Sequence, residues 1–339
     1  EPNPIRSVDV IYRQRHSKTW VIIVSIRGDS HSRPYAVKVP LRDSPEDDWD
    51  PQHEHEAIVT LARIQKGSQT WRVPEPVGFG LDPRFLVTRY ASGTSMRTLA
   101  QPGMRRWARE KNARASEALC RRAGECLACM RSDTAERENH VEPVEDSILA
   151  FCDARLGEVA RFHGRPYAAG VCGKLRSRLD SLVASKLGEC KSLLAYRYGC
   201  HGDFAPQNML VDDGSTITLL DLEGFRFSVL NEDAATFRFR LEHLALRGTF
   251  SNERLTRCWQ AFFDQLGDTK RDRLYLTISY TYKLLAQLAW LLNPERRVPD
   301  PARTRIRNWL WIRGRLDWLR HLADANSVER MCAMLRGDL

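Results

Sequence analysis

The first ninety residues alternate between short apolar runs and polar turns, a pattern that is typical of β-strands. β-branched residues dominate the run at 20–26. A helical period follows at 52–64, where Ile58, Leu61 and Ala62 share one face. The predicted strands are Val8–Tyr12, Trp20–Ile26, Tyr35–Val39, Val77–Leu81 and Phe85–Tyr90. We therefore expect this part of the chain to fold in the order β-β-β-α-β-β.

Beyond Gly93 the apolar residues recur mostly with the period of a helix. Helices are predicted near 105–131, 147–163, 173–188, 231–247, 252–266, 270–293, 301–322 and 327–336. A β-hairpin interrupts this series, because Met209–Val211 and Ile217–Leu220 flank the turn Asp212-Asp213-Gly214. The second part of the chain is therefore expected to be helical around one short hairpin.

The composition indicates a folded protein with an anionic partner. Hydrophobic residues make up 42% of the 339 residues, which allows a substantial core. The formal charge of +9 favours a phosphorylated sugar, a nucleotide, nucleic acid or an acidic membrane surface, unless it reflects only an Arg-rich proteome.

Nine scattered cysteines favour a reducing compartment, and the longest apolar segment is too short to span a bilayer. We expect a cytoplasmic protein.

The segment from Cys200 to Asn208 has the spacing of a phosphoryl-transfer loop. Asp203 and Asn208 lie five residues apart, and Asp221 follows thirteen residues later behind Leu219-Leu220. Phosphoryl transfer requires in-line positioning and neutralisation of negative charge more than covalent help. Asp203 would accept the proton of a substrate hydroxyl, and Asn208 and Asp221 would hold Mg²⁺. The alternative is a turn with solvated acids.

Lys38 lies in Tyr35–Val39, a strand close to the V-A-I-K pattern. A buried lysine on a strand is costly unless it is paired, and the α- and β-phosphates of ATP and a helix glutamate would pair it. Glu54 and Glu56 both begin the following helix. We choose Glu56, because it directly precedes Ala57 and the apolar repeat. An edge-strand lysine in solvent is the alternative.

Three further features belong to the predicted nucleotide site. Backbone groups at Arg89, Tyr90 and Ala91 would read the adenine edge, and Thr88 would line the back of the pocket. Glu223 lies two residues after Asp221, so it would support a second metal ion or a substrate hydroxyl, or else face solvent. The expected phosphate-covering turn at 13–18 contains no glycine, so its backbone wraps phosphate less freely.

These features predict an α+β, bilobal, protein-kinase-like fold. A small β-rich N-lobe would cover residues 1–90, and a large helical C-lobe would cover residues 91–339. The nucleotide would lie in the cleft between the two lobes. The C-lobe would then carry the catalytic loop, the metal site and the acceptor pocket.

The motifs resemble those of the aminoglycoside phosphotransferase and choline kinase family of small-molecule kinases. His201-Gly202-Asp203 is similar to the family's H-G-D, where protein kinases have H-R-D, and Leu220–Gly224 looks like its I-D-[WF]-[ED] segment. Glu56-Ala57 and Tyr90–Thr94 are further likenesses, and the likeness runs patchily over residues 8–230. The resemblance implies transfer of the ATP γ-phosphate to a hydroxyl with Mg²⁺.

The leading hypothesis is an ATP- and Mg²⁺-dependent kinase for a hydroxyl of a small molecule or saccharide. Arginine-rich C-terminal helices disfavour a cationic acceptor, so we expect a neutral or anionic one, such as a phosphorylated sugar or a lipid-linked saccharide. The same charge fits peripheral contact with an anionic membrane surface. The alternatives are an aminoglycoside-type antibiotic kinase, a protein kinase and a catalytically weak kinase-like scaffold. No nucleic-acid partner is expected, because there is no helix-turn-helix signature.

Overall fold

The chain divides into two compact units in this computed structural model, and each is described by itself. The first unit holds residues 1–99, 128–134 and 199–226, and the second holds residues 100–127, 135–198 and 227–339. This division differs from the predicted lobes at 1–90 and 91–339, because 199–226 groups with the β-rich part. The structure describes residues 7–15, 19–27, 32–41, 49–65, 67–137, 154–159, 161, 173–174, 176–177, 196–212, 216–228, 232–245, 249–267, 276, 279–281 and 283–289.

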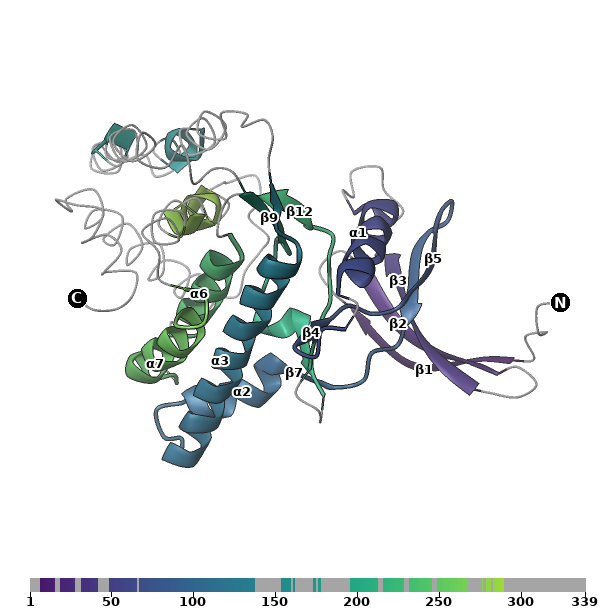
Figure 1. Cartoon of the computed structure of the whole chain (residues 1–339), viewed down its shortest axis with the longest axis horizontal. Coiled ribbons are helices and arrows are strands. Elements are labelled where there is room, and N and C mark those ends of the chain that lie inside the picture. The colour runs from purple at the N-terminus through teal and green to yellow at the C-terminus, as the bar shows by residue number, and fades with distance from the viewer. Residues whose placement is uncertain are drawn as a thin grey trace. The chain divides into compact units, whose positions relative to one another are not determined.

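A five-stranded antiparallel sheet dominates the first unit (Figure 1). Its strands are β1 (Ser7–Arg15), β2 (Thr19–Arg27), β3 (Ser32–Pro40), β5 (Pro76–Leu81) and β6 (Arg84–Arg89). They lie in the order β1-β2-β3-β6-β5, and helix α1 (Pro51–Ile64) packs against β5 and β6. The predicted order β-β-β-α-β-β is confirmed, with one additional short strand, β4 (Trp71–Arg72).

Helix α1 begins at a strong N-terminal cap. The Asp50 side chain accepts a hydrogen bond from the Gln52 N–H at 2.9 Å, and Pro51 occupies the first helical position. The side chains that the helix buries beyond Pro51 recur with helical spacing, and they are Glu54, Ala57, Ile58 and Leu61. The buried face thus contains a carboxylate, which needs a charged or hydrogen-bonding partner.

A second, four-stranded sheet in the same unit contains the predicted hairpin. Its strands are β4, β7 (Thr94–Ser95), β10 (Met209–Val211) and β11 (Ile217–Leu219), in the order β4-β11-β10-β7. Met209 pairs with Leu219, and the Leu220 N–H donates to the Asn208 carbonyl at 2.9 Å. The hairpin therefore brings the chain back beside Asn208. Asp221 directly follows Leu220, whose backbone N–H is hydrogen-bonded to the Asn208 carbonyl.

Helices form most of the described part of the second unit. Helix α3 (Glu110–Asp133) belongs to it up to residue 127, and α6 (Glu232–Ala245) and α7 (Asn252–Phe263) match the helices predicted at 231–247 and 252–266. Described residues within 147–163, 173–188 and 270–293 are helical as well. The helices predicted at 301–322 and 327–336 lie outside the described residues.

Some elements were not predicted. Helix α2 (Met96–Met104) contains Pro102 and Gly103, residues that normally interrupt a helix. The strands β8 (Glu136–Arg137), β9 (Tyr196–Cys200) and β12 (Arg226–Ser228) form a small sheet in the order β12-β9-β8. These short strands are far apart in the chain, so no turn motif marks them in the sequence as Asp212-Asp213-Gly214 marks β10 and β11.

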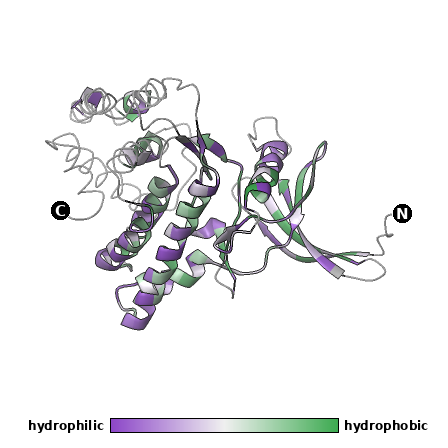
Figure 2. Cartoon of the chain, in the orientation of Figure 1, coloured by the Kyte–Doolittle hydropathy of each residue, from purple (hydrophilic) through white to green (hydrophobic). Residues whose placement is uncertain are grey.

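Aromatic stacking holds α6 and α7 together in the second unit. The rings of Phe237 on α6 and Phe262 on α7 stack with centroids 4.1 Å apart, and within α7 the ring of Trp259 stacks on Phe262 at 5.5 Å. Figure 2 shows both hydrophobic and hydrophilic residues on α3 and α7, as expected of helices with one buried face. Among the described residues, no helix is both long and apolar enough to cross a membrane.

Candidate active site

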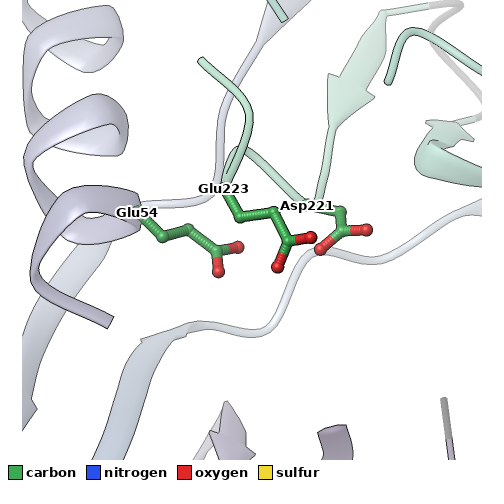
Figure 3. A group of neighbouring side chains, drawn as sticks. All are labelled: Glu54, Asp221 and Glu223. Atoms are coloured by element: carbon green, nitrogen blue, oxygen red, sulfur yellow. The ribbon is translucent and has the colours of Figure 1, made fainter. Parts of the chain in front are cut away.

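The ammonium group of Lys38 lies among three carboxylates. Its Nζ atom is 2.8 Å from Glu54 Oε2, 2.6 Å from Asp221 Oδ1 and 3.9 Å from Glu223 Oε2. Figure 3 shows the three carboxyl groups directed toward one region, Glu54 from α1 and the other two from the segment after β11. The side chains of Lys38 and Glu54 are 13% and 4% exposed, whereas those of Asp221 and Glu223 are 41% and 38% exposed. The cluster thus has a buried side and an open, acidic side.

Glu54, and not Glu56, is the helix partner of Lys38, so the predicted pairing with Glu56 is wrong. Glu56 instead accepts a hydrogen bond from Gln52 Nε2 at 2.8 Å. The reason is the phase of the helix: Glu54 lies four residues before Ile58 and shares its buried face. A role of Glu56 in nucleotide binding stays a prediction, and it would not act through a contact with Lys38.

The surroundings of Lys38 keep its amine protonated. Burial alone would lower the pKa of Lys38, but the charges and hydrogen bonds of Glu54 and Asp221 together raise it above its ordinary value. While the two carboxylates are ionised, the raised pKa means that the protonated Lys38 stabilises the fold fully below the ordinary lysine pKa. This stabilisation is lost as the pH rises through the folded-state pKa of Lys38. Lys38 is therefore a permanent cation at neutral pH.

Asp221 has a left-handed backbone, with φ of 64°. A residue with a Cβ pays about 1–2 kcal/mol for this conformation, although aspartate tolerates it better than most residues. The bend follows directly after β11 and turns the Asp221 carboxylate toward Lys38. Strain of this kind is common where a side chain has to be aimed at a ligand.

Asp203 and Asn208 are joined to each other. Asn208 Nδ2 donates to the Asp203 backbone carbonyl at 3.0 Å and to Asp203 Oδ2 at 3.1 Å. With its amide nitrogen used in this way, the Asn208 side chain has its oxygen left as a ligand atom. The structure thus brings together the predicted pair Asp203 and Asn208, and separately the predicted residues Lys38, Asp221 and Glu223.

The loop that carries Asp203 packs closely against the segment that carries Asp221. Gly202 has φ of 87°, and a Cβ built on it would lie 2.4 Å from the Gly224 carbonyl oxygen. Only glycine combines this backbone conformation with this close approach. The glycine of His201-Gly202-Asp203 is therefore required for the close packing of the segments that carry the predicted residues Asp203 and Asp221.

The hinge residues predicted from the sequence lie at the end of β6. Thr88 is buried, whereas Tyr90 is exposed. The Arg89 N–H donates to the Glu75 carbonyl at 2.9 Å, and the Tyr90 N–H donates to the Pro34 carbonyl at 3.2 Å. Among these described residues, the N–H of Ala91 is left without a backbone partner. Of the predicted phosphate-covering turn at 13–18, residues 13–15 form the end of β1, and residues 16–18 lie outside the described residues.

The acidic side of the cluster fits a hard divalent cation. Glu54, Asp221 and Glu223 each offer one oxygen atom, and these atoms all lie within 4.8 Å of one another. Carboxylate oxygens are the ligands that Mg²⁺ prefers. Of the predicted metal ligands, Asp221 and Glu223 belong to this set, and Asn208 is bonded through its backbone to the residue before Asp221.

Two members of the cluster were not among the predicted site residues. The first is Glu54, which could have been found from Asp50-Pro51, because a capping aspartate before proline fixes where the helix begins and hence which side chains face the sheet. The second is Trp49, whose indole Nε1 donates to Glu54 Oε2 at 2.8 Å. No sequence motif marks that contact.

The pattern of the phosphotransferase enzyme family matches residues 24–273 of the chain. The match covers the Lys38 strand, the Glu54 helix and the loop with Asp203 and Asp221. The chain therefore belongs to this phosphotransferase enzyme family. No curated protein matches it in sequence.

Solved structures support the protein-kinase-like fold of this family. An aminoglycoside phosphotransferase from Alicyclobacillus acidocaldarius superposes with a TM-score of 0.56 at 16% identity, over 95% of this chain and 93% of that one. A thermostable mutant of another aminoglycoside phosphotransferase gives 0.54 at 15% identity, over 95% and 97%. An ethanolamine kinase from Plasmodium vivax gives 0.50 at 11% identity, over 97% and 85%. At these low identities the likeness shows the fold alone.

Proposed function

We propose that the protein transfers the γ-phosphate of ATP to a hydroxyl group of a small molecule or saccharide that is neutral or anionic, with Mg²⁺ as cofactor. Membership of the phosphotransferase family supports the reaction class. The observation that carries the proposal is the cluster in which Lys38 Nζ lies 2.8 Å from Glu54 and 2.6 Å from Asp221. Such a cluster combines a cation for phosphates with excess carboxylate for a metal.

Each side chain has a distinct task in this proposal. Lys38, steadied by Glu54, would bind the α- and β-phosphates, and Asp221 with Glu223 and Asn208 would hold Mg²⁺. The metal, when bound, neutralises charge on the phosphates. Asp203 would orient the acceptor hydroxyl and take its proton, because the Asn208 amide fixes one of its carboxylate oxygens at 3.1 Å.

The adenine would be read by the hinge. Because the N–H groups of Arg89 and Tyr90 already donate to Glu75 and Pro34, the Ala91 N–H is the hinge donor best suited to an adenine nitrogen. Buried Thr88 would line the inner wall of the same pocket. Both assignments concern backbone and small side chains, so they do not by themselves select ATP over GTP.

The class of acceptor rests on charge. The net charge of +9 disfavours a cationic acceptor. Not every arginine of the late helices contributes to that argument, because Arg238 pairs with Glu242 and Arg257 pairs with Glu110. A neutral or anionic hydroxyl compound is therefore proposed from the overall charge, and not from a defined pocket.

The proposal is tested by incubating the protein with MgATP and a mixed set of hydroxyl compounds. The set would contain neutral sugars, sugar phosphates, anionic glycosides and cationic aminoglycosides. We expect a gain of about 80 Da, the mass of one phosphoryl group, on a neutral or anionic compound and none with Asp203→Asn. Transfer confined to the cationic compounds would overturn the acceptor class, and absence of transfer to every compound and to water would overturn the kinase activity.

A further inference from the structure

Trp49 makes two contacts with the Lys38–Glu54 pair. Its indole Nε1 donates to Glu54 Oε2 at 2.8 Å, and its ring centroid lies 5.3 Å from Lys38 Nζ. The Trp49 side chain is buried, so neither contact is screened by bulk water. A single tryptophan therefore touches both partners of the pair.

The start of α1 sets this geometry. Asp50 caps the helix and Pro51 follows as its first residue, so Trp49 directly precedes the cap and Glu54 is the fourth helical residue. In many helices the residues at these two positions are both apolar and pack together, which fixes the angle at which the chain enters the helix. Here the same spacing brings an indole N–H to a carboxylate.

Glu54 Oε2 accepts from both Lys38 and Trp49 at 2.8 Å. A buried carboxylate that loses a partner is strongly destabilised. If Lys38 turns toward phosphates, the indole N–H stays bonded to Glu54 and keeps the carboxylate from rotating. The Trp49 backbone is also fixed, because Arg84 Nη1 donates to its carbonyl at 3.4 Å.

We propose that Trp49 is a positioning residue for phosphoryl transfer, which holds Glu54, and through Glu54 the Lys38 ammonium, in the orientation that the ATP phosphates require. This inference rests on the proposed function. Trp49 itself touches neither phosphate nor acceptor in this scheme. Its effect is expected on the rate of transfer more than on nucleotide affinity, because a loosely held lysine still attracts phosphate but orients it less well.

The chain offers a matched control in Trp71. This residue is also buried, and its Nε1 donates to Asp133 Oδ2 at the same distance of 2.8 Å. Trp49→Phe and Trp71→Phe therefore each remove one indole hydrogen bond to a carboxylate and leave an aromatic ring. Only the first carboxylate contacts Lys38.

The experiment compares the two variants with wild type, using MgATP with water as acceptor for turnover and a fluorescent N-methylanthraniloyl ATP with Mg²⁺ for binding. Thermal unfolding checks that both variants fold. We expect Trp49→Phe to lower kcat about tenfold while the Kd of the fluorescent nucleotide changes less than about twofold. Trp71→Phe should lower the melting temperature to a similar extent and leave kcat within about twofold of wild type.

A double-mutant cycle separates positioning from general support of the fold. If Trp49 acts through Glu54, Trp49→Phe should lower kcat no further in a Glu54→Ala background. An undiminished loss in that background, or equal kcat for Trp49→Phe and Trp71→Phe, would overturn the inference while the kinase activity stands. A wild-type protein that neither binds the fluorescent nucleotide nor turns over MgATP would overturn the proposed function, and the inference with it.

Discussion

Each unit of the protein contains a partly buried cation that is paired with a glutamate and lies beside an aromatic ring. The two ion pairs differ in the further residues that contact them. Lys38 meets Glu54 and, 183 residues away in sequence, Asp221. Arg238 meets Glu242 one turn further along α6 at 2.8 Å, with its guanidinium 5.1 Å from the ring of Trp259. The Tyr280 hydroxyl also donates a hydrogen bond to Glu242, so Arg238, Glu242, Trp259 and Tyr280 form the second group, called the Arg238 group.

The difference lies in the charge balance and the exposure. Lys38 contacts three carboxylates, and two of them are more than a third exposed. Arg238 pairs with Glu242 on its own helix, and the rings of Trp259 and Tyr280 lie over the guanidinium. A balanced pair within one helix stabilises the fold. Excess acid on an open side instead provides a place for a further cation.

The largest expected effect comes from removing one of the exposed acids. Asp221→Asn should lower MgATP turnover about a thousandfold, because it removes the anionic ligand that we propose for the metal. The melting temperature should not fall, since Lys38 keeps Glu54. Turnover and thermal unfolding are measured on the same sample. Asp212→Asn, which breaks a peripheral pair with Arg72, is the control and should keep wild-type turnover.

The second unit should show the opposite behaviour. Glu242→Ala should reduce the free energy of unfolding by about 3 kcal/mol, because it leaves the covered Arg238 guanidinium without its carboxylate. Turnover of MgATP per folded molecule should stay at the wild-type value. Urea denaturation at constant temperature measures the first quantity. A folded Glu242→Ala protein with strongly reduced turnover would mean that this pair serves the reaction and not the fold.

Gly202→Ala tests whether the two catalytic segments of the first unit must pack as tightly as the structure shows. The added Cβ would lie 2.4 Å from the Gly224 carbonyl oxygen at a backbone φ of 87°. We expect a loss of about 2 kcal/mol in stability, together with reduced turnover in the molecules that remain folded. Gly78→Ala is the control, since a Cβ there meets nothing within 4 Å. Equal stability of both variants would contradict the close packing.

The smallest effect concerns the cation that already occupies the acidic cluster. Because Lys38 Nζ contacts all three carboxylates, a divalent ion has to compete with it. Lys38→Met should therefore raise the affinity for Mn²⁺ in the absence of nucleotide about tenfold, as measured by electron paramagnetic resonance. Lys111→Met, on the exposed face of α3, is the control. Unchanged or weaker Mn²⁺ binding in Lys38→Met would show that the lysine does not hold the metal position.

The sequence predicted the first unit well because its elements have strong local signals. Alternating apolar runs predicted β2 and β3, which the structure confirms, and the spacing of Asp203, Asn208 and Asp221 predicted candidate catalytic segments. The choice of Glu56 was wrong because it relied on an adjacent motif and not on the helical phase set by Asp50 and Pro51.

Other features depend on contacts that no local pattern encodes. Trp49 contacts Glu54 through a cap geometry in which an indole replaces the usual apolar pair, and its proximity to Lys38 depends on how α1 packs on the sheet. The Arg238 group needs Trp259 and Tyr280 from other helices, although Arg238 and Glu242 have helical spacing. Predicting such groups requires the tertiary structure.

The central claim is that the exposed acids around Lys38 form a metal–nucleotide site. Calorimetric titration of ATP in Mg²⁺ and in EDTA tests it most directly, on wild type, Asp221→Asn and Glu242→Ala. The account predicts that Mg²⁺ raises ATP affinity at least about tenfold in wild type and in Glu242→Ala, and that Asp221→Asn loses this gain. ATP binding that is indifferent to both Mg²⁺ and Asp221 would contradict it.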